Sequence, residues 1–170
     1  MSHRLRAAAV ALMLSAIPAS GVCAQLHTNL SLAAGASFPT GSFGDVYDTG
    51  YHLLVGVGLN PPLSPVGFRI DGMFNEFDVS GASSAKTRVL GLSGNLLVNA
   101  SGGLGPYLAG GVGLYDTRPT GGGDRNDVGF NVGVGFRLGL AGFSAFAEAR
   151  YHRVGDGVAQ FIPVTFGVTF

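Results

Sequence analysis

Hydrophobic and polar residues alternate with a period of two along most of the chain. The pattern is clearest in residues 161–170, where every second side chain is apolar. The apolar face of this segment carries Ile162, Val164, Phe166, Val168 and Phe170. A period of two with one wholly apolar face is typical of a β-strand. Because this face is long and uncharged, it suits contact with lipid better than a small soluble core.

The same alternation predicts eight strands separated by turn signals. Their predicted ranges are 28–38, 50–59, 66–77, 86–99, 105–116, 128–140, 143–153 and 161–170. Each has about the length that a strand needs to cross a bilayer at a tilt. An even number of antiparallel strands closes into a barrel and leaves no unpaired edge in lipid. We therefore predict an all-β fold, an eight-stranded antiparallel up-and-down transmembrane β-barrel.

The connections between the predicted strands alternate between short and long. Compact turns are expected at 60–65, 99–104 and 141–142. Longer polar loops are expected at 39–49, 78–85, 117–127 and 154–160. Short turns on the periplasmic side and longer loops outside are the pattern of outer-membrane barrels. This predicts a multi-pass protein of the bacterial outer membrane with both termini in the periplasm.

Charged residues within the predicted strands fall on the face that also carries glycine. The narrow interior of an eight-stranded barrel holds small side chains and a few paired ions, whereas charge that faces lipid is destabilising. We therefore predict a structural cluster of charges in the lumen, made of Arg69, Asp71, Arg137, Glu148 and Arg150. Arg137 should lie diagonally across a hairpin from Glu148, within side-chain reach. The alternative is an ion pathway along the same residues.

Aromatic residues near the strand ends predict two girdles at the membrane interfaces. The girdle at the loop ends would contain Tyr51, Phe74, Tyr115, Phe130 and Tyr151, and the girdle at the turn ends Phe68, Phe143 and Phe170. Between them, Val134 should face lipid near the midplane. Its neighbour Gly135 should face the lumen, where a small polar group is expected to fit.

The amino terminus reads as a secretory signal. A charged start is followed by an apolar run that is too short to span a bilayer as a helix, and small residues then precede Gln25. We predict a signal peptide over residues 1–24, cleavage between Ala24 and Gln25, and a barrel domain over residues 25–170. Lipidation of Cys23 is the alternative, but the residues before it lack the usual leucine. Cleavage after Ala24 would leave the mature protein without cysteine.

Composition favours a surface that meets lipid. Charged residues make up 12% of the chain, about half the usual share, and Lys86 is the single lysine. A soluble lipocalin-like cup that holds a ligand is another barrel class, but it needs a charged exterior. No basic tract is present, so nucleic-acid binding has no electrostatic footprint.

Candidate residues for catalysis or metal binding are few. His27, His52 and His152 have neither a cysteine partner nor a second histidine at ligand spacing. A lipid esterase would need a nucleophile beside a histidine base, and no histidine has a serine two positions away. The glycine repeats lack the dinucleotide fingerprint, and residues 121–127 lack the spacing of a calcium loop. We therefore expect no catalytic, cofactor or metal site.

Three internal stretches and the last strand carry a family resemblance. The stretches are 35–45 (GASFPTGSFGD), 105–115 (GPYLAGGVGLY) and 146–152 (FAEARYH). With residues 161–170 they resemble the outer-membrane β-barrel domain family, compact barrels related in architecture to OmpA and OmpX. The resemblance implies the barrel fold but no single activity. It also implies that the strand ending in Phe170 is similar to the signal read by the outer-membrane assembly machinery, which makes that machinery a partner.

These observations lead to an expected function without catalysis. We expect an integral outer-membrane barrel with a structural or surface-interaction role, in adhesion or envelope integrity. Its expected partners are membrane lipid, lipopolysaccharide and an extracellular ligand of unknown identity that meets the loops. The alternative is a small pore for ions or small solutes. Eight strands enclose an interior that side chains just fill, which favours the first hypothesis.

Overall fold

The computed structural model describes residues 27–61, 64–101 and 104–170. The predicted signal peptide, Cys23 and the cleavage position between Ala24 and Gln25 lie outside these residues. In the part of the chain that the structure describes, no helix is long and apolar enough to cross a membrane.

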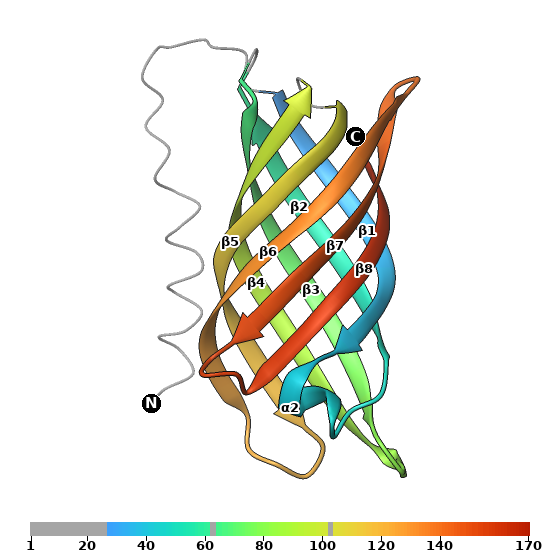
Figure 1. Cartoon of the computed structure of the whole chain (residues 1–170), viewed down its shortest axis with the longest axis vertical. Helices are drawn as coiled ribbons and strands as arrows, with labels where there is room; N and C mark the ends of the chain where they lie inside the picture. The colour runs from blue at the N-terminus through green and yellow to red at the C-terminus, as the bar shows by residue number, and fades with distance from the viewer. Residues whose placement is uncertain (1–26, 62–63, 102–103) are drawn as a thin grey trace, which may run out of the picture.

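Eight strands form one closed antiparallel barrel, as the alternation predicted (Figure 1). Each strand pairs with its neighbours in the sequence, and the last pairs with the first. The strands are β1 (His27–Pro39), β2 (Gly50–Asn60), β3 (Val66–Val79), β4 (Ala82–Ser101), β5 (Leu104–Pro119), β6 (Arg125–Leu140), β7 (Phe143–Val154) and β8 (Ala159–Thr169). One short helix, α2 (Gly41–Gly44), lies between β1 and β2.

The two ends of the barrel differ. The start of β1, the carboxyl terminus and the β6–β7 connection lie at the upper end in Figure 1, with the end of β2, the start of β3, the end of β4 and the start of β5. We call this the turn end. Helix α2 and the connections β3–β4, β5–β6 and β7–β8 lie at the opposite end, which we call the loop end.

The barrel closes along the seam between β1 and β8. Backbone groups of Leu30 and Phe170 exchange hydrogen bonds of 3.0 and 2.9 Å, and the hydroxyl oxygens of Ser31 and Thr169 lie 2.9 Å apart. Nearer the loop end, a Cβ on Gly35 would lie only 1.9 Å from the carbonyl oxygen of Val164. Glycine is therefore needed at position 35 for the two strands to approach.

Side chains along each strand alternate between the lipid face and the lumen, which confirms the predicted faces. On β6, Val134 is 57% exposed, whereas the inward Asn131 is 2% exposed. The expectation that Gly135 accepts a serine is wrong. A Cβ at this position would lie 2.2 Å from Cζ of Tyr107, because the tyrosine ring fills the space opposite the glycine.

The strands at the loop end are longer than predicted, and residues 78–85 do not form a long loop. β3 and β4 remain paired up to Val79 and Ala82, and Gly81 turns the chain with a φ of 77°. Strands β5 and β6 also continue, to Pro119 and from Arg125. Residues 78–85, 117–119 and 125–127 carry no continuous apolar row, so the strand alternation gives no signal there.

Helix α2 closes the barrel at the loop end. It directs Phe43 inward, where the ring lies 5.2 Å from Phe77 and 4.3 Å from Tyr47 between centroids. We call the surrounding cluster the apolar cap. Its buried members are Phe43, Met73, Phe77, Val89, Tyr115, Val154, Ala159 and Phe161.

Aromatic pairs occupy both ends of the lipid face. Tyr51 and Phe74 lie 5.7 Å apart near the loop end. Phe143 and Phe170 lie 6.1 Å apart near the turn end. Tyr115 does not belong to the girdle, because it is 1% exposed and packs inside the barrel.

Candidate functional site

Four of the predicted lumen charges form a network that crosses the barrel. Arg69 and Asp71 stand two residues apart on β3, and Glu148 and Arg150 stand two residues apart on β7, so all four side chains point inward. In the closed order, β3 and β7 are four strands apart in either direction and lie on opposite walls. We call these residues the ion quartet.

The ion quartet is a closed ring of alternating charge. Arg69 Nε lies 2.7 Å from Asp71 Oδ1, and Arg69 Nη2 lies 2.9 Å from Glu148 Oε2. Arg150 Nη1 lies 2.9 Å from Asp71 Oδ2, and Arg150 Nη2 contacts Glu148 Oε1 at 2.5 Å. All four side chains are at most 3% exposed. Each acid therefore lies between two guanidinium groups, and the four charges sum to zero.

Neighbouring walls hold the ion quartet in place. Tyr107 on β5 donates its hydroxyl to Glu148 Oε2 at 2.9 Å. Asn95 on β4 donates Nδ2 to Asp71 Oδ2 at 2.9 Å, and Asn131 on β6 donates to Asn95 Oδ1 at 2.9 Å. Five strands thus contribute to one polar layer, and charged groups that are paired and hydrogen-bonded in this way are the kind that tolerate burial.

Arg137 lies beside this layer, toward the turn end. The strand register sets Gly135 opposite Glu148 and Arg137 opposite Phe146, which gives the diagonal placement that the hairpin predicted. The guanidinium carbon of Arg137 lies 5.2 Å from the centroid of the Tyr107 ring. The cation thus packs on the face of the same tyrosine that binds Glu148.

The two buried histidines lie in the lumen wall between the ion quartet and the apolar cap. His52 Nδ1 lies 2.8 Å from Asn75 Oδ1, and His152 Nδ1 lies 3.0 Å from the hydroxyl of Tyr115. The His152 ring also stacks on Phe161, at 5.0 Å between centroids and an angle of 1°. Among the described residues, no three His, Cys, Asp or Glu side chains come together as a metal site.

Charged residues on the outer wall gather at the loop end. A set of them, which we call the rim cluster, follows the outer face of β3, β4 and β5 and contains Glu76, Asp78, Lys86, Arg88, Asp116 and Arg118. The turns at 60–65, 99–104 and 141–142 contain no charged residue. The two ends of the barrel therefore differ sharply in electrostatic character.

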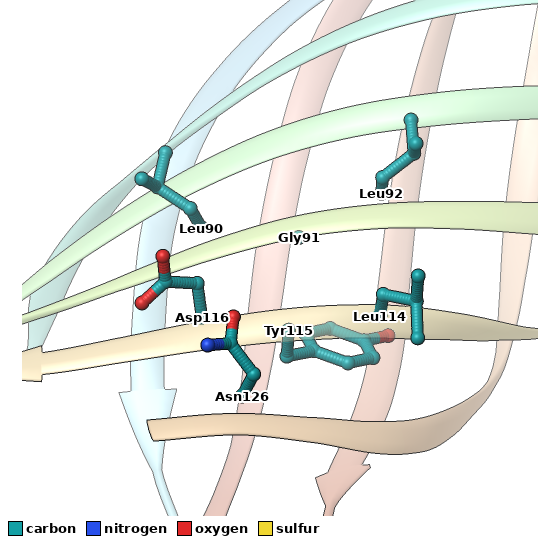
Figure 2. A pocket seen from close by; sticks show the side chains of 7 residues that line it. All are labelled: Leu90, Gly91, Leu92, Leu114, Tyr115, Asp116 and Asn126. Atoms are coloured by element: carbon teal, nitrogen blue, oxygen red, sulfur yellow. The ribbon is translucent and has the colours of Figure 1, made fainter. Parts of the chain in front are cut away.

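A shallow pocket of about 240 Å³ lies directly below the rim cluster on the outer wall (Figure 2). Figure 2 shows Leu92 and Leu114 toward one side of it and Leu90 beside Asp116 and Asn126 toward the other. Sequence reasoning missed this site. The alternation assigns each of its residues to a face of a strand. The pocket itself depends on which residues of β4, β5 and β6 stand opposite one another, and only the folded structure gives that register.

Comparison with known proteins gives one family and several similar folds. The chain matches the family described as outer membrane protein beta-barrel domain over residues 7–170. No curated protein matches the chain in sequence.

Three solved structures share the fold. The Neisserial surface protein A is 16% identical, with 84% of this chain and 95% of that chain covered and a TM-score of 0.61. The Yersinia pestis outer membrane protein Ail is 12% identical, with 84% and 98% covered and a TM-score of 0.51. A major outer membrane protein of Thermus thermophilus is 14% identical, with 84% and 98% covered and a TM-score of 0.51. At these identities the likeness concerns the fold.

Proposed function

The chain belongs to the outer membrane protein β-barrel domain family, and from that premise we propose that it is a closed barrel with a structural or surface-interaction role. In this proposal the loop end contributes to adhesion or envelope integrity, and the protein neither conducts solutes nor catalyses a reaction. The apolar wall binds membrane lipid, and the loop end meets lipopolysaccharide or an extracellular ligand.

The observation that carries this proposal is the ion quartet. It joins opposite walls at the level where a pore would need free space, with contacts of 2.7 and 2.9 Å from Arg69 alone. Toward the loop end the apolar cap adds a second obstruction, in which Phe77 and Phe161 are fully buried. A solute would have to displace both layers.

The absence of catalysis is supported by how the polar residues are used. Glu148 is held between Arg69 and Arg150, and each buried histidine is hydrogen-bonded inside the wall. A general base or nucleophile has to reach a substrate. Glu148 and the buried histidines instead bind other side chains of the barrel.

The proposal includes an orientation, with the loop end outside the cell and both termini in the periplasm. Longer polar loops on the outer side are usual for such barrels, and the rim cluster lies at that end. Lys86 allows a direct test, because it is the single lysine and its side chain is 43% exposed. A membrane-impermeant amine reagent should label intact cells at Lys86, and Lys86→Arg should abolish the label. Labelling only after the outer membrane is broken would reverse the orientation.

Targeting and assembly complete the proposal. Residues 1–24 act as a signal peptide that is removed before Gln25, and the outer-membrane assembly machinery binds the last strand through Phe170. The Phe170 side chain is 60% exposed beside Phe143 at the turn end, so it is accessible to a partner. Amino-terminal sequencing of outer-membrane material should find Gln25 first, and a retained Met1 would contradict cleavage.

Planar bilayer recording tests the closed lumen against the pore. The wild-type protein should show little or no conductance. Because small barrels can open briefly, only steady current that scales with salt counts as a pore. Such current, with a selectivity that changes in Glu148→Gln or Arg137→Gln, would replace the closed barrel by the alternative of a small channel.

A further inference from the structure

Two features of the outer wall coincide at the loop end, an apolar pocket and a pair of arginines. Three successive outward pairs of β4 and β5 are Leu92 with Leu114, Leu90 with Asp116, and Arg88 with Arg118. Along this short ladder the wall changes from apolar to charged. At about 6.6 Å for each two-residue step, the distance from the leucine pair to the arginine pair is about 13 Å, which suits an amphiphile that lies along the wall.

Arg88 and Arg118 stand directly opposite each other on adjacent strands. Like charges in this position are destabilising unless opposite charge compensates them. Glu76 accepts from Arg88 Nε at 2.7 Å, and Asp116 accepts from Nε and Nη2 of Arg118. Arg88 donates to Glu76 through Nε, and its guanidinium group carries further N–H donors on the two terminal nitrogens.

Arg88 and Arg118 are more exposed than the two acids that accept their hydrogen bonds, Glu76 and Asp116. The side chains of Arg88 and Arg118 are 58% and 50% exposed, whereas those of Glu76 and Asp116 are 8% and 23% exposed. Two exposed guanidinium groups are therefore offered to a ligand, and the exposed Asp124 carboxylate lies 4.0 Å from Arg118 Nε. Guanidinium binds phosphate through two parallel hydrogen bonds, and two neighbouring arginines can hold one phosphate between them.

The pocket below supplies the apolar part of the site. Leu90, Leu92 and Leu114 are 38%, 53% and 65% exposed on its walls, and Asp116 and Asn126 lie at its polar side (Figure 2). Its volume of about 240 Å³ is smaller than the ~300–1,000 Å³ of a compact small-molecule site. It suits a single acyl chain, and the polar side offers groups for sugar hydroxyls.

We propose that this surface is a binding site for the phosphorylated glycolipid of the outer leaflet. A phosphate of the lipid A part of lipopolysaccharide lies between Arg88 and Arg118, and one acyl chain lies against Leu90, Leu92 and Leu114. The inference rests on the proposed orientation, in which the loop end faces the outer leaflet. It goes further by naming the ligand class and the residues that bind it.

Native mass spectrometry of the detergent-solubilised protein tests the site by counting bound lipid over a titration. The probe is diphosphorylated lipid A, and the variant is Arg88→Gln with Arg118→Gln. Each lost charge-assisted contact to phosphate should weaken binding, by about tenfold or more for the pair. Arg125→Gln with Arg153→Gln removes the same charge from the same end of the barrel, at positions whose side chains do not line the pocket. It should leave the affinity within about twofold of the wild type, since surface charges at a distance are screened.

Further arms identify the source of the phosphate and the role of the pocket. Lipid A without phosphates, inorganic phosphate and phosphatidylglycerol should all bind more weakly than diphosphorylated lipid A. Leu114→Ala should weaken lipid A binding, whereas Leu108→Ala, on the same strand outside the pocket, should not. Urea unfolding of every variant is measured in parallel, so that loss of the fold is recognised.

Several results would overturn the inference. One is an equal loss of lipid A affinity in the two arginine double variants, and another is no loss of affinity in either. A third is binding of inorganic phosphate or phosphatidylglycerol as tight as that of lipid A. The proposed function is tested separately, by bilayer conductance and by labelling of Lys86 on intact cells. If both of those tests agree with the closed barrel and one of the results above is found, only the lipid A site is disproved.

Discussion

Arg150 Nη1 on β7 lies 2.9 Å from Asp71 Oδ2 on β3, so an ion pair joins two walls that no backbone hydrogen bond connects. In a barrel, each strand is otherwise tied only to its two neighbours. The ion quartet adds a cross-brace through the lumen. We expect the loss of any one member to be costly, because the charges left without a partner would be almost fully buried.

Glu148→Gln should destabilise the barrel by about 3–5 kcal/mol, because it leaves buried positive charge without a partner. The free energy of unfolding is measured by urea titration in lipid vesicles. Glu76→Gln is the matched control, since Glu76 also binds two cations, Lys86 and Arg88, but these are 43% and 58% exposed at the rim. There, solvent screens the interaction and the loss should be small. Equal losses in the two variants would mean that the lumen is well hydrated.

The assignment of the outer wall to lipid predicts that the cost of a substitution by arginine depends on its depth in the bilayer. Val134→Arg should destabilise by about 2–4 kcal/mol and Val128→Arg by about 0–1 kcal/mol, because the cost of arginine falls from the midplane to the interface. Val128 stands opposite Leu114, two pairs from the polar Asp116 and Asn126. Unfolding in vesicles checks both. A soluble cup would show no such dependence on depth.

Two glycines in the barrel wall, Gly135 and Gly94, should differ in how much an added methyl group destabilises the fold. Gly135→Ala should destabilise by about 1–3 kcal/mol through overpacking, since its Cβ would meet the Tyr107 ring at 2.2 Å. It should also weaken the hydrogen bond from Tyr107 to Glu148. Gly94→Ala is the control, because nothing lies within 4 Å of its added Cβ. A neutral Gly135→Ala would show that the ring moves aside freely.

Removing the ring of Phe43 should open the loop end. Phe43→Ala deletes a side chain that is 5% exposed and packs on Tyr47 and Phe77, and such truncations cost about 3–5 kcal/mol in a well-packed core. Amide hydrogen exchange should rise around α2 and at the loop ends of β3 and β8. It should not change at the ion quartet. Exchange that rises uniformly would mean that the cap and the quartet unfold together.

The role of Phe170 in assembly is separable from its role in closure. Deleting Phe170 would remove the two backbone hydrogen bonds to Leu30, so Phe170→Ala is the cleaner change. Outer-membrane levels should fall, with periplasmic accumulation or degradation, while Phe170→Tyr should remain near the wild type. Refolding of purified Phe170→Ala into vesicles should still succeed. A defect in refolding would instead assign the loss to the barrel itself.

The strand alternation was enough to predict the barrel and its faces, because a period of two leaves each side chain only one of two directions. It failed where that signal disappears. Residues 78–85 are mostly small or polar and form no apolar row, so the sequence cannot distinguish a loop from a hairpin there. Tyr115 was assigned to the girdle only because it lies near a strand end, although the alternation of β5 sets it on the same inward face as Tyr107.

The lumen cluster shows a similar limit. The residue types that fill it were predictable from their shared face, but their partners were not. Glu148 binds Arg69, which is 79 residues away in the sequence. Only closure of the sheet brings β3 and β7 together. The pocket below Arg88 and Arg118 was unpredictable for the same reason, since it depends on register across three strands.

The seam between β1 and β8 has a kinetic consequence. Ser31 and Thr169 meet across 138 residues of sequence, so the two halves of the seam cannot pair until almost the whole chain is present. Loops of that length close slowly, and proteins rich in such distant contacts fold slowly. Until that moment β1 and β8 are both open edges, ready to pair with another chain. The newly made protein therefore has to be kept apart from its copies, and membrane insertion and sheet closure are expected to proceed as one event.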